Sequence, residues 1–314
     1  MKRLISIAVS LLILVIIYSK IDFSGLIKVF QNCNGWWMII SLGMVVPLTL
    51  ITSWRLQQLM PAGARLGFGE ANRLILAASV LNMVLPSKMG DIAKAYFMKQ
   101  RGHLDGSLSL SLVVFEKACD MLSLLLWCAF GLMLYPSKNW LFWTMTVCIA
   151  VGLIVGVLLL SYRKFAKVFF LIGKAILPKK FKLKLQKLEL AWEEMQAYFW
   201  HDKAQLLKIT FTSIFIWFLH LLQIWFFILA LKAWTPLLAN LALAPLAILA
   251  GLLPLTFAGV GTRDAALIAF YQPYFNAPTA AALGLLCTSR YLLPAIGGMP
   301  FLGQYLSTVR NLRK

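Results

Sequence analysis

Apolar segments without a charged residue recur along the whole chain of 314 residues. One of them, from Ala233 to Thr262, has 30 residues, and about 20 apolar residues in a helix are enough to cross the hydrocarbon core of a bilayer. Hydrophobic residues make up 61% of the chain and charged residues only 13%. These proportions exclude a soluble domain and a disordered chain. The sequence therefore predicts an all-α polytopic membrane protein.

Six segments read as full transmembrane helices. They are Leu4–Tyr18, Trp36–Ser53, Leu108–Tyr135, Trp140–Tyr162, Leu206–Leu231 and Ala277–Tyr305. The first resembles a signal peptide, but no small-residue cleavage site follows it, so we interpret it as an uncleaved span. Trp36, Trp37 and Trp54 stand at the ends of the second segment, which is typical of the membrane interface.

Two further apolar segments are interrupted by Pro and Gly. The first, Ala71–Gln100, contains Pro86 and Gly90, and the second, Ala233–Tyr271, contains Pro254, Gly259 and Gly261. Each has an apolar arm, a turn with a basic and an acidic residue, and a short second arm. Paired broken segments of this kind indicate re-entrant helical hairpins in an inverted repeat, with Pro and Gly as hinge residues. Frequent Pro and Gly in membrane helices is the alternative explanation.

Basic residues are distributed asymmetrically between the apolar segments. If each broken segment returns to the side it entered, 23 of the 30 Lys and Arg residues face one side, which the positive-inside rule assigns to the cytoplasm. This count includes Arg55, Lys88 and Lys94, and it places both termini in the cytoplasm of a bacterial inner membrane. The two broken hairpins then enter from opposite sides, as an inverted repeat requires.

We expect a single integral membrane domain from residue 1 to 314, with a basic cytoplasmic linker at residues 163–203. The linker is rich in Lys, and apolar residues recur at helical spacing in its second half: Phe181, Leu185, Leu188, Trp192, Met195 and Phe199. This pattern predicts an amphipathic helix on the anionic leaflet, with a solvated loop as the alternative.

Ionisable residues at membrane depth are the candidate functional groups, because each costs roughly 2.5–3.5 kcal/mol on insertion scales. Glu116 and Asp120 share one face of a span, since they are four residues apart. Arg290 lies in the last span, and Arg263 and Asp264 lie at the second turn. We expect some of these to pair, with a carboxylate within reach of each Arg. A purely structural ion pair is the alternative to a role in handling a headgroup or an ion.

The first turn carries Lys88, Asp91 and Lys94. Interrupted half-helices direct their dipole ends and free backbone groups into a cavity, which suits a phosphate. The lysines can add charge-assisted hydrogen bonds to such an anion. We therefore assign these three residues, with the membrane-embedded groups above, to a lipid headgroup site.

Motifs of catalysis are weak in this sequence. There is no G-x-S-x-G, H-E-x-x-H or C-x-x-C pattern, and the five cysteines form no paired spacing. We expect no catalytic residue, no cofactor, no metal site and no nucleic-acid partner. The basic charge is explained by orientation and by anionic lipids.

Four motifs in order resemble the lysylphosphatidylglycerol synthase transmembrane-region family, the flippase-like domain of the MprF aminoacyl-phosphatidylglycerol proteins. They are Asn82–Ala95, Glu116–Asp120, Pro254–Asp264 and Arg290–Tyr291. The family pattern has Arg at the positions of Lys88 and Lys94 and Glu at that of Asp264, which weakens bidentate phosphate binding by the two lysines. The resemblance implies a stand-alone lipid-handling domain without the synthase domain.

The sequence thus favours binding and flipping of an anionic phospholipid or a polyprenyl-linked lipid. Two alternatives stay open. One is an integral-membrane transferase for a lipid-linked sugar or phosphate, with Asp91 or Glu116 as base. The other is a non-transporting partner of a separate lipid-modifying enzyme. The expected partners are membrane lipids, and a dimer is one possible oligomeric state.

Overall fold

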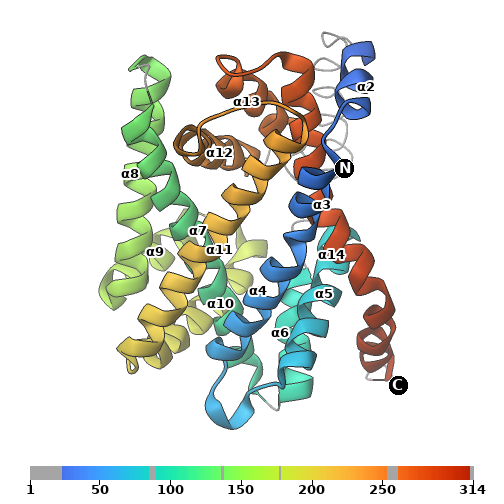
Figure 1. Cartoon of the computed structure of the whole chain (residues 1–314). Helices are drawn as coiled ribbons and strands as arrows, with labels where there is room; N and C mark the ends of the chain where they lie inside the picture. The colour runs from blue at the N-terminus through green and yellow to red at the C-terminus, as the bar shows by residue number, and fades with distance from the viewer. Residues whose placement is uncertain are drawn as a thin grey trace. The chain divides into compact units, whose positions relative to one another are not determined.

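The computed structural model describes residues 23–84, 90–102, 104–135, 138–176, 178–252 and 261–311, and these are helical almost throughout (Figure 1). No β-strand occurs within the described ranges. The helices follow in the order α2 (Phe23–Gln31), α3 (Gly35–Gly43), α4 (Val45–Leu59), η1 (Ala62–Ala64), α5 (Phe68–Val84), α6 (Gly90–Gly102), α7 (Gly106–Leu134), α8 (Trp140–Ser161), α9 (Arg163–Ile176), α10 (Lys179–Phe199), α11 (Lys203–Ala230), α12 (Leu237–Gly251), α13 (Thr262–Tyr271) and α14 (Ala277–Asn311).

Five helical segments of the described chain are long and apolar enough to cross a membrane. They are Gly35–Leu59, Gly106–Leu134, Phe142–Ser161, Lys203–Ala230 and Ala277–Gly303. Five of the six predicted spans are thereby confirmed as long apolar helices, and the prediction of an all-α polytopic membrane protein holds. The remaining predicted span, Leu4–Tyr18, lies outside the described residues.

The chain forms two compact units. Unit 1 contains Met1–Leu48, Leu124–Ile149 and Ile216–Leu293, and unit 2 contains Thr49–Ser123, Ala150–Phe215 and Pro294–Lys314. The boundaries fall inside α4, α7, α8, α11 and α14, so that each of these helices contributes residues to both units.

Each unit contains one of the two predicted helical hairpins. In unit 2, α5 packs on α6 so closely that a Cβ on Gly90 would lie 2.4 Å from the carbonyl oxygen of Ala78. In unit 1, α12 packs on α13, and α12 continues through Pro245 without a break. The turns with Pro86, Lys88, Pro254 and Gly259 lie outside the described residues. The inverted relation of the hairpins stays a prediction.

The core of unit 2 joins the end of α4 with α5, α6, α7 and α10. The rings of Phe115 and Phe199 stack there with their centroids 3.9 Å apart. Ala191 and Met195 of α10 are also buried. The expectation that the apolar stripe of this helix faces lipid is therefore wrong for its C-terminal half, because the stripe packs into the protein.

Unit 1 is held by polar groups that bond to helix carbonyls. The amide of Asn240 donates to the carbonyl oxygen of Leu221 at 2.9 Å, and its own oxygen accepts from the Tyr271 hydroxyl at 2.8 Å. Gln223 donates to the carbonyl oxygen of Ser41 at 2.8 Å. Buried polar groups need such partners, and here they connect α3, α11, α12 and α13.

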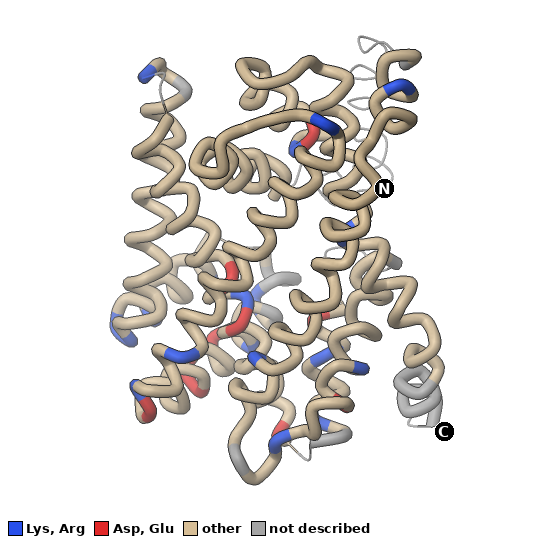
Figure 2. Tube along the Cα trace, viewed as in Figure 1, with Lys and Arg blue, Asp and Glu red and all other residues tan. Residues whose placement is uncertain are grey.

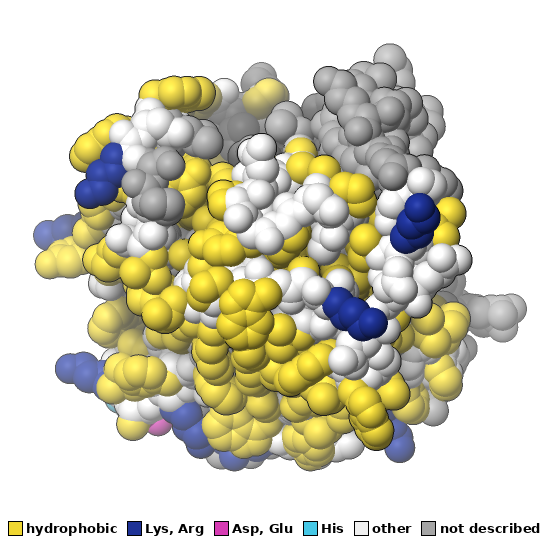
Figure 3. Space-filling model, turned by 45° about the horizontal axis from the view of Figure 1, so that its top comes forward, with side chains coloured by type: hydrophobic (Ala, Val, Ile, Leu, Met, Phe, Trp, Pro, Cys, Tyr) yellow, Lys and Arg dark blue, Asp and Glu magenta, His cyan; other side chains and the backbone are white. Residues whose placement is uncertain are grey.

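Apolar side chains cover much of the surface, as a lipid-facing protein requires. Figure 3 shows one face on which hydrophobic side chains gather around only a few Lys and Arg residues. Of the most apolar 18 residues of α8, only 6% are buried, against 50% in α14. The traces of α8 and α11 carry long stretches without charge (Figure 2). We interpret α8 as a peripheral helix in contact with acyl chains.

Candidate functional site

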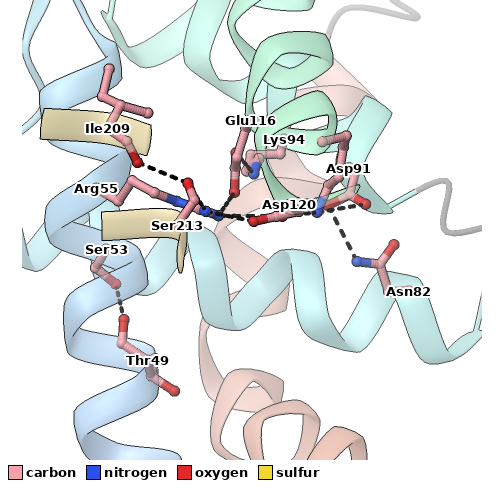
Figure 4. Close-up of polar contacts among 11 residues, drawn as sticks. Thr49, Ser53, Arg55, Asn82, Asp91, Lys94, Glu116, Asp120, Ile209 and Ser213 are labelled. Atoms are coloured by element: carbon pink, nitrogen blue, oxygen red, sulfur yellow. Dashed lines mark hydrogen bonds and ion pairs between the residues drawn. The ribbon is translucent and has the colours of Figure 1, made fainter. Parts of the chain in front are cut away.

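Charged side chains from three helices meet inside unit 2, and Figure 4 shows their polar contacts. We call them the unit-2 ion cluster: Arg55 from α4, Asp91 and Lys94 from α6, and Glu116, Lys117 and Asp120 from α7. Glu116 and Asp120 share a face of α7 because they are one turn apart. The structure thus brings together four of the predicted site residues, Asp91, Lys94, Glu116 and Asp120.

Arg55 is the centre of the buried end of this cluster. Its guanidinium donates to Asp120 Oδ1 at 2.5 Å and Oδ2 at 3.3 Å, to Glu116 Oε1 at 3.0 Å and to Ser213 Oγ at 2.8 Å. The ammonium of Lys94 donates to the other oxygen of Glu116. Arg55, Lys94 and Glu116 are each at most 2% exposed. One carboxylate therefore joins two buried cations from different helices.

The other end of the cluster is accessible. Lys117 Nζ lies 3.3 Å from Asp91 Oδ2 and 3.7 Å from Asp120 Oδ2, and its side chain is 45% exposed. Asn82 adds a long hydrogen bond of 3.5 Å to Asp91. The cluster as a whole is balanced, with three basic and three acidic side chains, so its buried charges are already compensated within the protein.

Arg55 was not expected at this site. The sequence interpretation ended the second span at Ser53 and placed Arg55 and Lys94 among the cytoplasmic charges. In the structure α4 continues to Leu59, and Leu56 and Leu59 are buried. Leu56 and Leu59, which follow Arg55 in the sequence, are the feature that could have indicated a buried continuation of the helix. These two buried cations are not loop charges, and they weaken the charge count used for orientation.

Unit 1 contains a second polar site at the start of α13. Gly261 precedes this helix with φ 102°, a conformation that glycine adopts without strain. Its N–H donates to Asp264 Oδ2 at 3.0 Å. Arg263 donates to Asp264 Oδ1 from Nε at 3.1 Å and from Nη2 at 2.8 Å. The expectation of a carboxylate partner is confirmed for Arg263.

Two helices fix the position of the Arg263–Asp264 pair. Nη2 of Arg263 also donates to the carbonyl oxygen of Gly284 at 3.0 Å and to Thr288 Oγ1 at 2.9 Å, both on α14. A Cβ on Gly284 would lie 2.7 Å from Asp264 Oδ1, and a Cβ on Gly251 would lie 2.8 Å from Cβ of Arg263. Glycine at these two positions allows the ion pair to fit between α12 and α14.

We expect the Gly284→Ala substitution to destabilise unit 1. The added methyl group must displace the carboxylate of Asp264, and overpacking of this kind costs typically about 1–3 kcal/mol. Gly43→Ala is the matched control, because nothing lies within 4 Å of a Cβ at that position. The measurement is denaturant unfolding of both variants in the same detergent. Equal stability of the two variants would contradict the close packing at Gly284.

Arg290 is the second buried guanidinium of unit 1, and it lies on α14. It is only 7% exposed, and its Nη1 donates a long hydrogen bond to the carbonyl oxygen of His220 at 3.4 Å. Among the described residues its Nε has no hydrogen-bond partner, and no carboxylate lies within 4.0 Å of it. The prediction that Arg290 pairs with a carboxylate is wrong within the described chain.

The reason is a shortage of acidic residues in this part of the sequence. Asp264 is the only Asp or Glu after Asp202, and Arg263 beside it takes its carboxylate. Among the described residues, unit 1 thus buries two guanidiniums and one carboxylate, which differs from the balanced cluster of unit 2.

No group of three or more His, Cys, Asp or Glu side chains in the described ranges is placed to hold a metal ion. Lys88 and the hinge residues Pro86, Pro254 and Gly259 lie outside those ranges, so their assigned roles stay predictions. The chemistry that the described side chains can perform is recognition of an anion by guanidinium and ammonium groups.

Five long apolar helices and buried charged side chains define the described chain as a polytopic membrane protein. Residues 3–298 match the family model described as the lysylphosphatidylglycerol synthase TM region, and the chain belongs to that family. It is also similar to a UPF0104 membrane protein of Methanocaldococcus jannaschii, with 24% identity over 315 residues, 95% of this chain and 93% of the relative. The protein is therefore a multi-pass membrane protein of a lipid-related family.

Proposed function

We propose that this protein binds the anionic headgroup of a phospholipid or polyprenyl-type lipid and moves that lipid between the leaflets of the membrane. The observation that carries the proposal is Arg290, a buried guanidinium in a membrane-spanning helix without a carboxylate partner among the described residues. The membership in the family of the lysylphosphatidylglycerol synthase TM region supports a role with lipids.

A phosphate would complete the charge balance of the unit-1 site. Among the described buried residues of unit 1, Arg263 and Asp264 neutralise each other, which leaves the positive charge of Arg290. An embedded Arg costs roughly 2.5–3.5 kcal/mol on insertion scales, and a bound anion would offset that cost. The planar guanidinium also suits two parallel hydrogen bonds to a phosphate. A phosphodiester with one negative charge matches the remaining charge.

The start of α13 in unit 1 supports the proposal that a headgroup can reach this site. The short helix α13 begins at Gly261 after an interruption of the apolar segment, and half-helices of this kind expose backbone groups in transporters. The polar headgroup would occupy the site while its acyl chains stay in the bilayer.

We propose a separate anion contact, within unit 2 alone, at the accessible end of the unit-2 ion cluster. Lys117 is half-exposed and shared between Asp91 and Asp120, so it can change partners without leaving a fully buried charge unpaired. Lys94 and Glu116 contribute by holding α6 against α7.

Native mass spectrometry of the protein released from detergent tests the headgroup site. The wild type should retain an anionic lipid, and Arg290→Ala should lose roughly tenfold or more of it, because hydrogen bonds to charged groups contribute about 1.5–3 kcal/mol. Lys208→Ala is the control, since that ammonium lies at the exposed surface over the ring of Trp54. Equal lipid retention by both variants would contradict the proposal.

Transport is measured separately from binding. Purified protein in liposomes should accelerate the passage of a fluorescent anionic lipid to the opposite leaflet, read by dithionite bleaching. The Arg290→Ala variant should abolish the acceleration, whereas Lys208→Ala should keep it. A protein that binds the lipid but leaves its leaflet exchange unchanged would be a binding partner rather than a transporter.

A further inference from the structure

Helix α9 follows the membrane-spanning helix α8 after a single residue. The apolar span ends at Ser161, and α9 begins at Arg163. The start of α9 must therefore lie at the end of the span, where the hydrocarbon core meets the headgroups.

Side chains of α10 hold this junction in place. The indole N–H of Trp192 and the amide of Gln196 donate to the carbonyl oxygen of Leu159 at 3.0 and 2.7 Å. The indole N–H of Trp200 donates to the carbonyl oxygen of Leu160 at 2.8 Å. These bonds satisfy carbonyl groups that the end of α8 leaves without helical partners. All these residues belong to unit 2, and they fix α9 and α10 against the end of the span.

One face of α9 packs on α10. Ala166 and Phe170 are buried, and the ring of Phe170 lies edge-on to Trp192 with the centroids 6.2 Å apart. Lys167 pairs with Glu193 at 3.4 Å, and Lys174 pairs with Glu189. The side of α9 that meets the protein is therefore already occupied.

A second face of α9 is apolar and exposed. Its residues are 47–78% exposed, and they are Val168, Phe169, Leu171, Ile172 and Ile176. Phe169, Ile172 and Ile176 follow each other at intervals of three and four residues, so they form one stripe along the helix. The stripe remains exposed beside the described side chains of α10, although α10 buries its own apolar residues Met195 and Phe199.

Basic residues of α9 lie beside the packed face and the apolar stripe, and two of them, Lys167 and Lys174, are the residues that pair with α10. The helix contains Arg163, Lys164, Lys167 and Lys174 and no acidic residue. An exposed apolar stripe beside basic residues is the pattern of a helix that lies in the interface of an anionic membrane. A shallow, mostly apolar groove lies where α8 meets α9, lined by Leu158, Tyr162, Lys164, Phe165 and Val168. The apolar side chains of this groove can contact a lipid acyl chain, and Lys164 places one ammonium group beside them.

We propose that α9 lies in the plane of the membrane at the leaflet where α8 ends, with its apolar stripe among the acyl chains and Lys164 binding an anionic lipid headgroup at the groove. The assignment goes beyond the proposed transport function and does not depend on Arg290. Within the predicted linker of residues 163–203, it assigns the membrane surface to α9 rather than to the apolar residues of α10.

Position-specific fluorescence tests the depth of α9. A variant without native cysteines receives one cysteine at position 169 or 167, labelled with an environment-sensitive nitrobenzoxadiazole dye, in nanodiscs of phosphatidylglycerol and phosphatidylcholine. Phe169 and Lys167 are two residues apart on nearly opposite faces, which makes them a matched pair. The dye at 169 should emit at shorter wavelength and be quenched by doxyl-labelled acyl chains, and the dye at 167 should be quenched by aqueous iodide. Equal quenching by iodide at both positions would overturn the placement, and it is the result expected of a face that awaits a protein partner.

The headgroup site is tested with the dye at position 169. Doxyl-labelled phosphatidylglycerol should quench it more strongly than doxyl-labelled phosphatidylcholine at the same mole fraction, with a relative affinity of about fivefold for one basic residue near the surface. Lys164→Gln should remove that preference, and Lys208→Gln should keep it. A preference that survives Lys164→Gln would overturn the headgroup site at the groove.

Discussion

Replacing Glu116 with Gln should lower the free energy of unfolding by about 3–5 kcal/mol, because it leaves a buried cation without a carboxylate. Glu116 holds both Arg55 and Lys94, and all three are at most 2% exposed. Arg55 keeps Asp120 after the substitution, but Lys94 has no other carboxylate within 4.0 Å in the described chain. The measurement is denaturant unfolding in detergent, followed by tryptophan fluorescence.

The exposed pair between Lys167 and Glu193 offers a control with the same chemical change. Glu193 is 44% exposed, so Glu193→Gln should cost no more than about 1 kcal/mol. The double variant Lys94→Met with Glu116→Gln should be more stable than Glu116→Gln alone, since it removes the unpaired charge. If Glu116→Gln proves as mild as Glu193→Gln, the ion cluster does not hold α4, α6 and α7 together.

The spans could be predicted from the sequence because the bilayer permits few structures. A backbone in hydrocarbon must satisfy its own N–H and C=O groups, so an apolar run long enough to cross has to be helical. The five long apolar helices, α8 among them, follow from this constraint. Whether Pro245 interrupts its helix could not be predicted from the sequence. In the structure α12 continues through it, because the surrounding packing tolerates the missing N–H.

The direction in which an apolar stripe faces could not be predicted in the same way. In α10 the stripe with Met195 and Phe199 packs into the core, while in α9 the stripe with Phe169 and Ile172 is exposed. Both patterns look amphipathic, because lipid and protein core are equally apolar. Only the three-dimensional packing on α7 distinguishes them, through the stacked rings of Phe115 and Phe199.

The acidic members of the site were recognisable because a carboxylate inside a span is rare. Their partners were not, since pairing depends on which helices touch. Arg55 follows Trp54, a residue that usually marks the membrane interface, and this placed it outside the span. We expected Arg290 to pair with a carboxylate. Asp264, however, is next to Arg263 in the sequence and forms its ion pair with Arg263.

The charge surplus at Arg290 predicts an unusual result for a buried membrane residue. Arg290→Met should leave stability in lipid-free detergent unchanged or increase it, because no described carboxylate loses its partner. Arg263→Met should instead lower stability by about 3–5 kcal/mol, since Asp264 then stays buried without a cation. The two substitutions remove the same group from the same unit, so each controls for the lost volume of the other.

Added anionic lipid should make the wild type more stable than Arg290→Met. An anionic lipid at 100 times its dissociation constant should stabilise the wild type by about 2.7 kcal/mol, because it binds only the folded state. Arg290→Met should show no such increase with phosphatidylglycerol, and neither protein should respond to phosphatidylcholine at the same concentration. If Arg290→Met is as unstable as Arg263→Met before lipid is added, the guanidinium has a structural partner. The phosphate would then have no unpaired charge to compensate, and the headgroup site in unit 1 would lose its support.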